Sequence, residues 1–350
     1  MTVKTSPGNF FEDFSVGQVL RHATPRTLTT GDVALNTALY GSRFAVHSSD
    51  MFARALGYPR APIDELLVFH MVFGKTVADI SLNAVANLGY AECIFHAAVY
   101  PGDTLSAESE VIGLREASNG KAGIVYVRTT GRNQDGDKVL EYVRWVMVHK
   151  RDPRAPAPEP AIPHLHKAVD ADQLGDAVPF IDTKAYDTWA SGSGDLWGDY
   201  APGERIDHVD GMTVEEAEHM LATRLYQNTA RVHFNQYAQA TDRFGRRLIY
   251  GGHVISLARA LSFNGLANAF HLAAINAGRH VAPLFAGDTV FAWSEIVDKQ
   301  PLSGREDVGA LRVRTFATKD LPCADFPGPV SDGHAEGVIL DLDYWVLMPR

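Results

Sequence analysis

The stretch LYGSRFAVH, residues 39–47, recurs 186 positions later as LYQNTARVH, residues 225–233. Both stretches begin with Leu-Tyr, end with Val-His and differ in the residues between. Sliding the chain against itself by 186 positions aligns residues 11–68 with 197–254 and gives 13 identities in 58 positions. Self-similarity at a fixed offset indicates an internal duplication. The sequence therefore predicts one fold written twice, with a site loop in each copy.

The duplication continues beyond these stretches and defines the domain organisation. YPGDTL (100–105) corresponds to FAGDTV (285–290), and the segment between the copies contains five prolines from 153 to 163. Proline fixes φ and removes a hydrogen-bond donor, so this segment is expected to be an extended linker. We predict an N-terminal domain over 1–150, a linker over 151–180 and a C-terminal domain over 181–350.

Composition restricts the class of protein. The chain has 350 residues, 46% of them hydrophobic, a formal charge of −10 and two cysteines without a CxxC motif. These values are typical of a globular protein from a reducing compartment, and the acidic balance argues against nucleic-acid binding. The sequence shows no signal peptide or apolar membrane span, so we expect a cytoplasmic protein. The histidines lack HExxH spacing, so no metal site is expected.

Each copy has the same predicted order of elements. A short helix (29–40, and 213–226) precedes the Val-His loop, and a long helix that is apolar on nearly every face follows it (Asp64–Ile80, and Gly251–Ala267). Such a helix is buried on all sides. Long strands come next, including a hairpin through Asp135-Gly136. We predict an α+β fold in which each buried helix is wrapped by an antiparallel sheet.

This pattern resembles the MaoC-like hydratase family, whose members have the hotdog fold. The resemblance rests on the Val-His loop, followed 16 residues later by Ile and by the buried helix. It implies two tandem hotdog domains, a double hotdog, present as a monomer or a possible homodimer. It also implies an acyl-CoA thioester as the substrate, with no separate cofactor.

The family pattern, roughly S-G-D-x-N-P-[IL]-H followed by His-Gly at the helix start, is altered in both copies. The Asp position holds Ser42 in the first copy and Asn228 in the second. Neither copy therefore keeps the family's Asp/His pair. The Asn-Pro positions hold Phe44-Ala45 in the first copy and Ala230-Arg231 in the second. The His-Gly positions hold Glu65-Leu66 in the first copy and Gly251-Gly252 in the second.

Hydration of an unsaturated thioester needs donors for the developing enolate and a group that moves a proton. Backbone N–H groups at a helix start are such donors, so we expect Gly251 and Gly252 to bind the carbonyl oxygen. The alternative is a tight turn or close helix packing. His233 is the candidate base, and Asn228 is expected to orient His233 or the water.

The carboxylate role is expected to fall to the first copy. Asp64 and Glu65 begin the first buried helix, near His47 in the chain, and we predict one functional site that uses residues of both halves. On this hypothesis His47 and His233 are both catalytic. The alternatives are that the two acids cap the helix and that His47 is structural.

A carboxylated substrate needs a cation, and Arg binds carboxylates with a matching fork of donors. Arg43 and Arg231 lie in the differing middles of the two loops and are the candidates. Solvated loop arginines are the alternative. Tyr40 and Tyr226, from the shared frame of the loops, are also assigned to substrate binding.

The resemblance implies a lyase that reversibly hydrates a carboxylated, branched enoyl-CoA, with mesaconyl-CoA as the expected substrate. Three alternatives stay open at this point. They are another MaoC-type hydratase acting on (3R)-hydroxyacyl-CoA or itaconyl-CoA, a non-catalytic acyl-CoA binding protein, and a hotdog thioesterase with Asp64 or Glu65 as its base.

Overall fold

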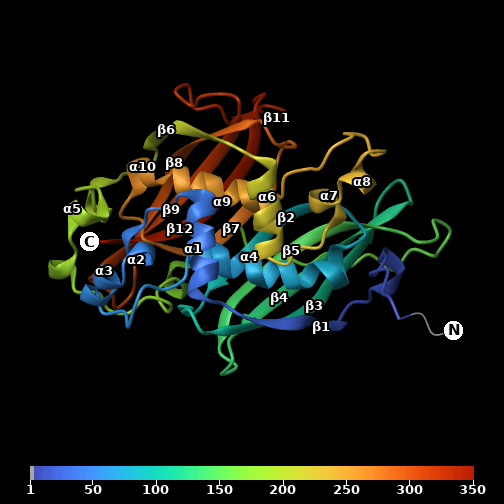
Figure 1. Ribbon diagram of the computed structural model, residues 1–350, viewed down its shortest axis with the longest axis horizontal. Coiled ribbons are helices and arrows are strands. Elements are labelled where there is room, and N and C mark those ends of the chain that lie inside the picture. Colours follow the sequence, from blue (N-terminus) through green and yellow to red (C-terminus); the bar gives the residue numbers. More distant parts are fainter. Residues whose placement is uncertain (1–3) are drawn as a thin grey trace.

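The computed structural model describes residues 4–350, and one ten-stranded sheet organises it (Figure 1). The strand order is β1-β3-β4-β5-β2-β7-β12-β9-β8-β6, and all neighbours pair antiparallel. The first five strands come from the first copy and the last five from the second. The bounds are β1 Val19–Thr27, β2 Ala84–Phe95, β3 Thr104–Glu116, β4 Ala122–Arg132, β5 Lys138–His149, β6 Arg205–Thr213, β7 His271–His280, β8 Thr289–Pro301, β9 Val308–Lys319 and β12 Val338–Pro349.

The two predicted buried helices are α4 (Glu65–Thr76) and α9 (Gly251–Leu261), and the strands wrap around them (Figure 1). Every residue of α4 is buried, as its uniformly apolar sequence predicts. This confirms the α+β prediction. The other helices are α1 Thr30–Tyr40, α2 Ala45–Ser48, α3 Asp50–Ala55, α5 Thr188–Ser191, α6 Glu216–Leu225, α7 Arg231–Phe234, α8 Gln236–Gln239 and α10 Phe263–Leu266, and β10 (Pro329–Val330) pairs with β11 (Gly333–His334) in the long loop before β12.

Two predicted helix bounds are wrong, and each has a local cause. The helix predicted over 213–226 begins at Glu216, because Thr213 still belongs to β6, where it pairs with Thr289. The helix predicted over Gly251–Ala267 is regular only to Leu261. Gly265 has a φ of +104°, a conformation that glycine adopts readily and that interrupts the helix.

A pseudo-twofold axis relates the two copies, and hydrogen bonds between equivalent residues mark it. Tyr40 Oη lies 2.6 Å from Tyr226 Oη, a pair 186 positions apart. His70 Nε2 on α4 lies 2.8 Å from Ser256 Oγ on α9, also 186 apart. The copies meet through the β2–β7 pairing, which continues the sheet across the axis. The duplication read from the sequence is therefore an internal dimer within one chain.

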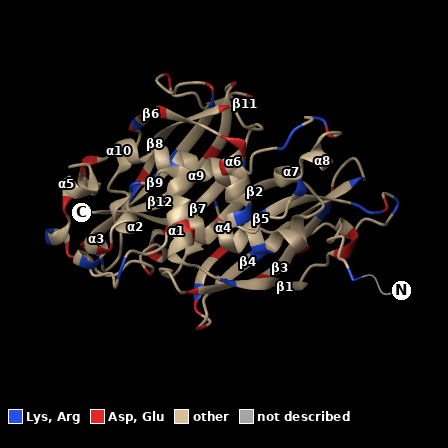
Figure 2. Ribbon diagram, in the orientation of Figure 1, with Lys and Arg blue, Asp and Glu red and all other residues tan. Residues whose placement is uncertain are grey.

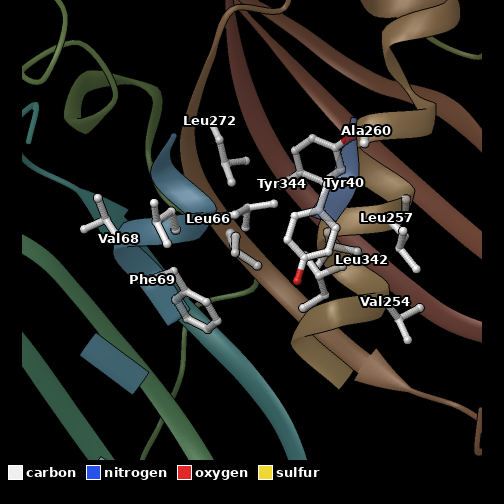
Figure 3. Close-up of a cluster of buried hydrophobic side chains, with 14 of the residues drawn as sticks. Tyr40, Leu66, Val68, Phe69, Val254, Leu257, Ala260, Leu272, Leu342 and Tyr344 are labelled. Atoms are coloured by element: carbon white, nitrogen blue, oxygen red, sulfur yellow. The ribbon is translucent and has the colours of Figure 1, made fainter. Parts of the chain in front are cut away.

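Side chains fill the space between the two helices. Leu66 points from the first turn of α4 toward Leu272 and Tyr344, and Tyr40 lies alongside (Figure 3). The cavity that Leu66, Leu272 and Tyr344 line has a volume of only about 10 Å³. A space of that size holds at most one water molecule, so this part of the interior is closely packed.

The linker between the copies packs against both of them. Ala161 forms an isolated bridge with Leu114, and Val169 is buried in a cluster that includes Phe270 and Trp345. Trp345 donates its indole N–H to Val169 O at 3.0 Å. The proline-rich segment thus begins without regular structure, and its later part completes the outer core of the second copy.

Charged residues are distributed over the periphery, and the ribbons of α4 and α9 are mostly free of them (Figure 2). Within residues 4–350, no helix combines the length and apolar character that crossing a membrane requires. Cys93 and Cys323 are both buried and free.

Candidate active site

The residues predicted for one shared site fall into two groups in the structure. The first, which we call the copy-one cluster, consists of His47, Asp64, Glu65 and His271. Glu65 accepts a hydrogen bond from His271 Nδ1 at 2.7 Å and lies 3.3 Å from His47 Nε2. Since His271 belongs to β7, this ion-paired group ties the loop and helix of the first copy to the sheet of the second.

His47 is bonded in a way that fixes its charge. Nδ1 lies 3.1 Å from Pro62 O, and Nε2 lies 3.0 Å from Phe270 O. A carbonyl oxygen only accepts hydrogen bonds, so both ring nitrogens carry protons and the ring is an imidazolium. Burial opposes that charge, but the Glu65 and Asp64 carboxylates and the bond to Pro62 O together outweigh burial and raise the pKa of His47 to about 9. A histidine in this state is no base near neutral pH.

Asp64 is the N-terminal cap of α4. Its Oδ1 accepts a hydrogen bond from Leu66 N–H at 2.8 Å. Burial raises the pKa of Asp64, and the positive charge of His47 opposes that rise. The contacts of Asp64 are therefore those of a helix cap, which was the alternative prediction. The N–H group of Leu66 already has a partner in Asp64.

The second group, the copy-two cluster, lies at the start of α9 and consists of His233, Tyr250, Gly251, Gly252 and His280. Tyr250 takes the N-cap position that Asp64 takes in α4, and its side chain makes no capping hydrogen bond. The first N–H groups of a helix have no partner within it. Gly251 and Gly252 thus present uncapped donors at the positive end of the helix dipole.

The two glycines are required by the rings packed against them. A Cβ atom on Gly251 would lie 2.3 Å from His280 Cε1. A Cβ atom on Gly252 would lie 2.4 Å from Tyr250 Cε1 and 2.5 Å from His70 Cε1. These distances are far below van der Waals contact, so only glycine leaves the rings in place. The close packing predicted as the alternative is therefore present at both glycines. It leaves their N–H groups without a capping partner.

His233 has the protonation state that a base needs. Its Nδ1 donates to Leu248 O at 2.9 Å, which leaves the lone pair on Nε2. Burial lowers the pKa of His233 to about 4, and the bond to Leu248 opposes that shift only in part. His233 is therefore neutral near pH 7, whereas its counterpart His47 is charged. Its ring centroid lies 5.4 Å from that of Tyr250.

The remaining predicted residues have other surroundings. Asn228 is buried and uses its Oδ1 to accept from Ala230 N–H at 3.1 Å, within its own loop. Tyr40 and Tyr226 are buried on the pseudo-twofold axis, between α4 and α9. Arg43 is exposed and lies over the Phe263 ring at 4.4 Å, and Arg231 is exposed.

The hypothesis of one site shared by Glu65 and His233 does not match these contacts. The hydrogen-bond and ion-pair partners of Glu65 are His47, His271 and the Leu272 N–H, all in the copy-one cluster. His233 packs against His219 and Tyr250. The physical reason is the pseudo-twofold symmetry, which places the two helix starts at separate positions on opposite sides of the axis.

The copy-two cluster includes residues that sequence reasoning missed. Tyr250 directly precedes the glycines, and its alignment with Asp64 was a signal that could have identified it. His280 lies at the end of β7, and its Nε2 is 3.3 Å from Tyr90 Oη of the first copy. Burial lowers the pKa of His280 to about 4. No local motif marks His280 or Tyr90, because the β2–β7 pairing alone brings them together.

A larger cavity lies elsewhere. Its volume is about 340 Å³, and residues 171–180 of the linker and 302–305 after β8 line it. The buried charge on its wall, Arg305, is already bound by Asp307 at 2.7 Å. Among residues 4–350, no group of three His, Cys, Asp or Glu side chains is arranged to hold a metal ion. The helix starts remain the best candidate sites.

Solved structures with the same architecture define the class of protein. A protein from Chloroflexus aurantiacus described as a MaoC domain dehydratase superposes with a TM-score of 0.98 at 63% identity, over 100% of this chain and 99% of its own. A Mycobacterium tuberculosis protein described as having a double hotdog fold gives a TM-score of 0.76 at 25% identity, over 98% and 99%. The chain is a double-hotdog protein of the MaoC-like dehydratase class.

Sequence comparisons identify the family. The model of the mesaconyl-CoA hydratase family matches residues 2–323. The β-methylmalyl-CoA dehydratase of Chloroflexus aurantiacus is 64% identical, with 100% of this chain and 99% of that protein covered. The mesaconyl-CoA hydratase of Cereibacter sphaeroides is 59% identical, with 99% and 100% covered. The chain belongs to the mesaconyl-CoA hydratase family.

The charged state of His47 predicts how stability depends on pH. Its folded pKa of about 9 lies above its ordinary value of 6.5, so its contribution is fully present below pH 6.5 and is lost as pH rises through 9. A shift of this size corresponds to about 3 kcal/mol. We expect the free energy of unfolding, measured by urea denaturation, to fall over this range.

The variant His47→Gln should lose most of this pH dependence and be less stable at pH 6. The matched control is His166→Gln, because His166 is exposed in the linker. An unchanged slope in His47→Gln would show that the ring is not held as an imidazolium.

Proposed function

We propose that the chain catalyses the reversible hydration of mesaconyl-CoA to β-methylmalyl-CoA, as the names of its relatives say of them. The observation that carries the proposal is the uncapped start of α9, where Gly251 and Gly252 directly follow Tyr250 and the ring of a neutral His233 lies 5.4 Å from the Tyr250 ring. Donors for a developing oxyanion and a base with a free lone pair are what this reaction needs. Copy one offers neither, because Asp64 occupies Leu66 N–H and His47 is charged.

In the proposed mechanism, the thioester carbonyl oxygen accepts from the N–H groups of Gly251 and Gly252. His233 Nε2 takes a proton from a water molecule, and the water oxygen bonds to the β carbon. The electron pair of the double bond moves onto the thioester oxygen as an enolate, which the helix start stabilises. The imidazolium then returns the proton to the α carbon. Dehydration is the same path in reverse.

The low pKa of His233 acts in opposite directions on the two proton transfers, because it weakens the ring as a base toward water and strengthens the imidazolium as an acid toward carbon. Because burial lowers the pKa to about 4, the protonated ring is a strong acid that gives its proton to carbon readily. The same burial keeps the resting base neutral over a wide pH range. Tyr250 does not compete for the proton, because burial raises its pKa well above its ordinary value.

Each alternative function would need a different set of catalytic groups. A thioesterase with Asp64 or Glu65 as its base would use side chains that already cap α4 and pair with two histidines. A binding protein would need no neutral base beside the helix start. Another MaoC-type hydratase would share the mechanism and differ only in the acyl group, which includes (3R)-hydroxyacyl-CoA and itaconyl-CoA. The homodimer and the cytoplasmic location stay predictions.

The substrate is tested with purified protein and mesaconyl-CoA. We expect the absorbance of the enoyl-thioester to fall while no free thiol appears in a thiol-reagent assay. Itaconyl-CoA and crotonyl-CoA, run in parallel, should react far more slowly. Thiol release would support the thioesterase, and binding without an absorbance change would support the binding protein.

Gly252→Ala tests the helix start. The added methyl group would push the Tyr250 and His70 rings out of position, so we expect kcat/KM to fall by about 100-fold. Gly194→Ala is the matched control, because no atom lies within 4 Å of a Cβ built there. A Gly252→Ala enzyme with wild-type kinetics would remove the helix start from the mechanism.

His233→Gln separates the two clusters. We expect kcat to fall by about 10²–10⁴-fold, the usual contribution of a general base, with little change in thermal stability. His47→Gln should mainly lower stability, because it removes one of the two histidines that pair with the buried Glu65 carboxylate. If the stably folded fraction of His47→Gln lost kcat as severely as His233→Gln, the single shared site would be the better description.

A further inference from the structure

Arg144, on β5, is a buried cation without an ordinary partner. Its residue exposure is 0%, and it forms no ion pair with a described residue. Nη2 donates to Thr76 Oγ1 at 2.8 Å, Nη1 reaches Ser81 Oγ only at 3.4 Å, and Nε has no hydrogen-bond partner. Burying a charge under these conditions destabilises a fold, so an arginine retained there points to a ligand.

Two other buried cations of the described residues are neutralised by a carboxylate, whereas Lys75 on α4 donates to the Thr24 carbonyl oxygen. Lys150 lies 2.6 Å from Glu116, and Arg305 lies 2.7 Å from Asp307. Burial lowers the pKa of Arg259, while Tyr344, Asp64 and Glu65 act in the opposite direction. Arg259 also donates to Ala269 O. Burial likewise lowers the pKa of Arg144, but the acidic groups that oppose burial there are three phenols and no carboxylate, namely Tyr142, Tyr90 and Tyr250.

Arg144 lies on the side of the molecule that holds the copy-two cluster. Its guanidinium group is 4.3 Å from the centroid of the Phe73 ring on α4. That ring is 5.7 Å from the ring of Tyr250, the residue directly before Gly251. The cation is thus one aromatic ring beyond the uncapped helix start. A short acyl group whose carbonyl lies on α9 would extend toward it.

The second copy has no arginine at the corresponding strand position. Trp145 of β5 corresponds to Trp345 of β12, so Tyr344 replaces Arg144. Tyr344 donates to or accepts from Thr315 at 2.8 Å, and its hydroxyl is therefore satisfied. The unpaired strand cation belongs to one side of the axis only, the same side as the neutral His233 and the uncapped glycines.

We propose that Arg144 binds the free carboxylate of the acyl group while the thioester carbonyl lies on the N-terminus of α9. This inference rests on the proposed function and adds to it the residue that selects a carboxylated substrate. The planar guanidinium matches the two oxygens of a carboxylate, and the low polarity around it strengthens the pair. It assigns the role first expected of Arg43 or Arg231 to a residue in the interior.

The consequence is discrimination against uncharged acyl groups. An enoyl-CoA with a methyl group in place of the carboxylate would bury Arg144 without an anion. Sites that leave a buried polar group unpaired reject such analogues by several orders of magnitude. The proposal therefore predicts that this enzyme is selective through Arg144 and not through the size of its pocket.

The experiment compares mesaconyl-CoA with 2-methylcrotonyl-CoA, which carries a methyl group in place of the carboxylate. In Arg144→Met, which keeps an unbranched side chain and removes the charge, we expect kcat/KM for mesaconyl-CoA to fall at least about 100-fold. The value for 2-methylcrotonyl-CoA should stay constant or rise. Where that analogue turns over too slowly to measure, its inhibition constant against mesaconyl-CoA replaces kcat/KM.

Two variants serve as controls. Arg259→Met removes the buried arginine that Asp64 and Glu65 act on, and it should leave the ratio of the two substrates unchanged. Arg144→Lys keeps the charge and loses the forked geometry, so it should restore part of the preference for mesaconyl-CoA. If Arg144→Met does not fold, Arg144→Lys carries the test through a smaller loss confined to mesaconyl-CoA.

The possible results distinguish failure of the Arg144 role from failure of the proposed hydratase function. A wild-type protein that fails to hydrate mesaconyl-CoA overturns the proposed function. A wild-type protein that hydrates it, with Arg144 variants that change both substrates equally or neither, overturns the carboxylate role alone. An equal shift of the substrate ratio in Arg259→Met would also overturn it.

Discussion

The pairing of the two copies across the pseudo-twofold axis is the constraint on which the rest of the structure depends. The β2–β7 ladder joins two five-stranded halves into one sheet. The His70–Ser256 hydrogen bond joins the buried helices, and the Tyr40–Tyr226 hydrogen bond joins the ends of α1 and α6. Because α4 and α9 bury their faces against each other and the sheet, neither half has a complete core alone. Each helix start is consequently walled partly by residues of the other copy.

The two helix starts show how a duplicated scaffold divides its work. Asp64 caps α4 and, with Glu65, belongs to an ion-paired group that joins the halves. Tyr250 at the same position leaves α9 uncapped, and rings replace the carboxylates. One change of residue type at the N-cap thus decides whether a helix dipole is satisfied internally or offered to a ligand. His47 and His233 follow the same division, one charged and one neutral.

Burial governs the chemistry of the copy-two side. It lowers the pKa of His233 and of His280 to about 4, which keeps both rings neutral. It also makes the lone cation Arg144 costly unless an anion joins it. In copy one the same burial is compensated by Glu65, so its charges cancel within the protein. A carboxylated thioester would complete the charge balance on the other side.

The sequence by itself determined the duplication, the order of elements and the fold class, because hydrophobic periodicity and a fixed repeat offset are properties of the chain. It also gave Gly251, Gly252 and His233 as candidate site residues, and their roles stay a proposal. It predicted one shared site, which the contacts of the two clusters do not favour, and it did not find His280 or Arg144. Those depend on which strands pair and on which side of the axis a side chain emerges, and only the tertiary structure decided that, because burial and the partner across the axis set the charge of each group.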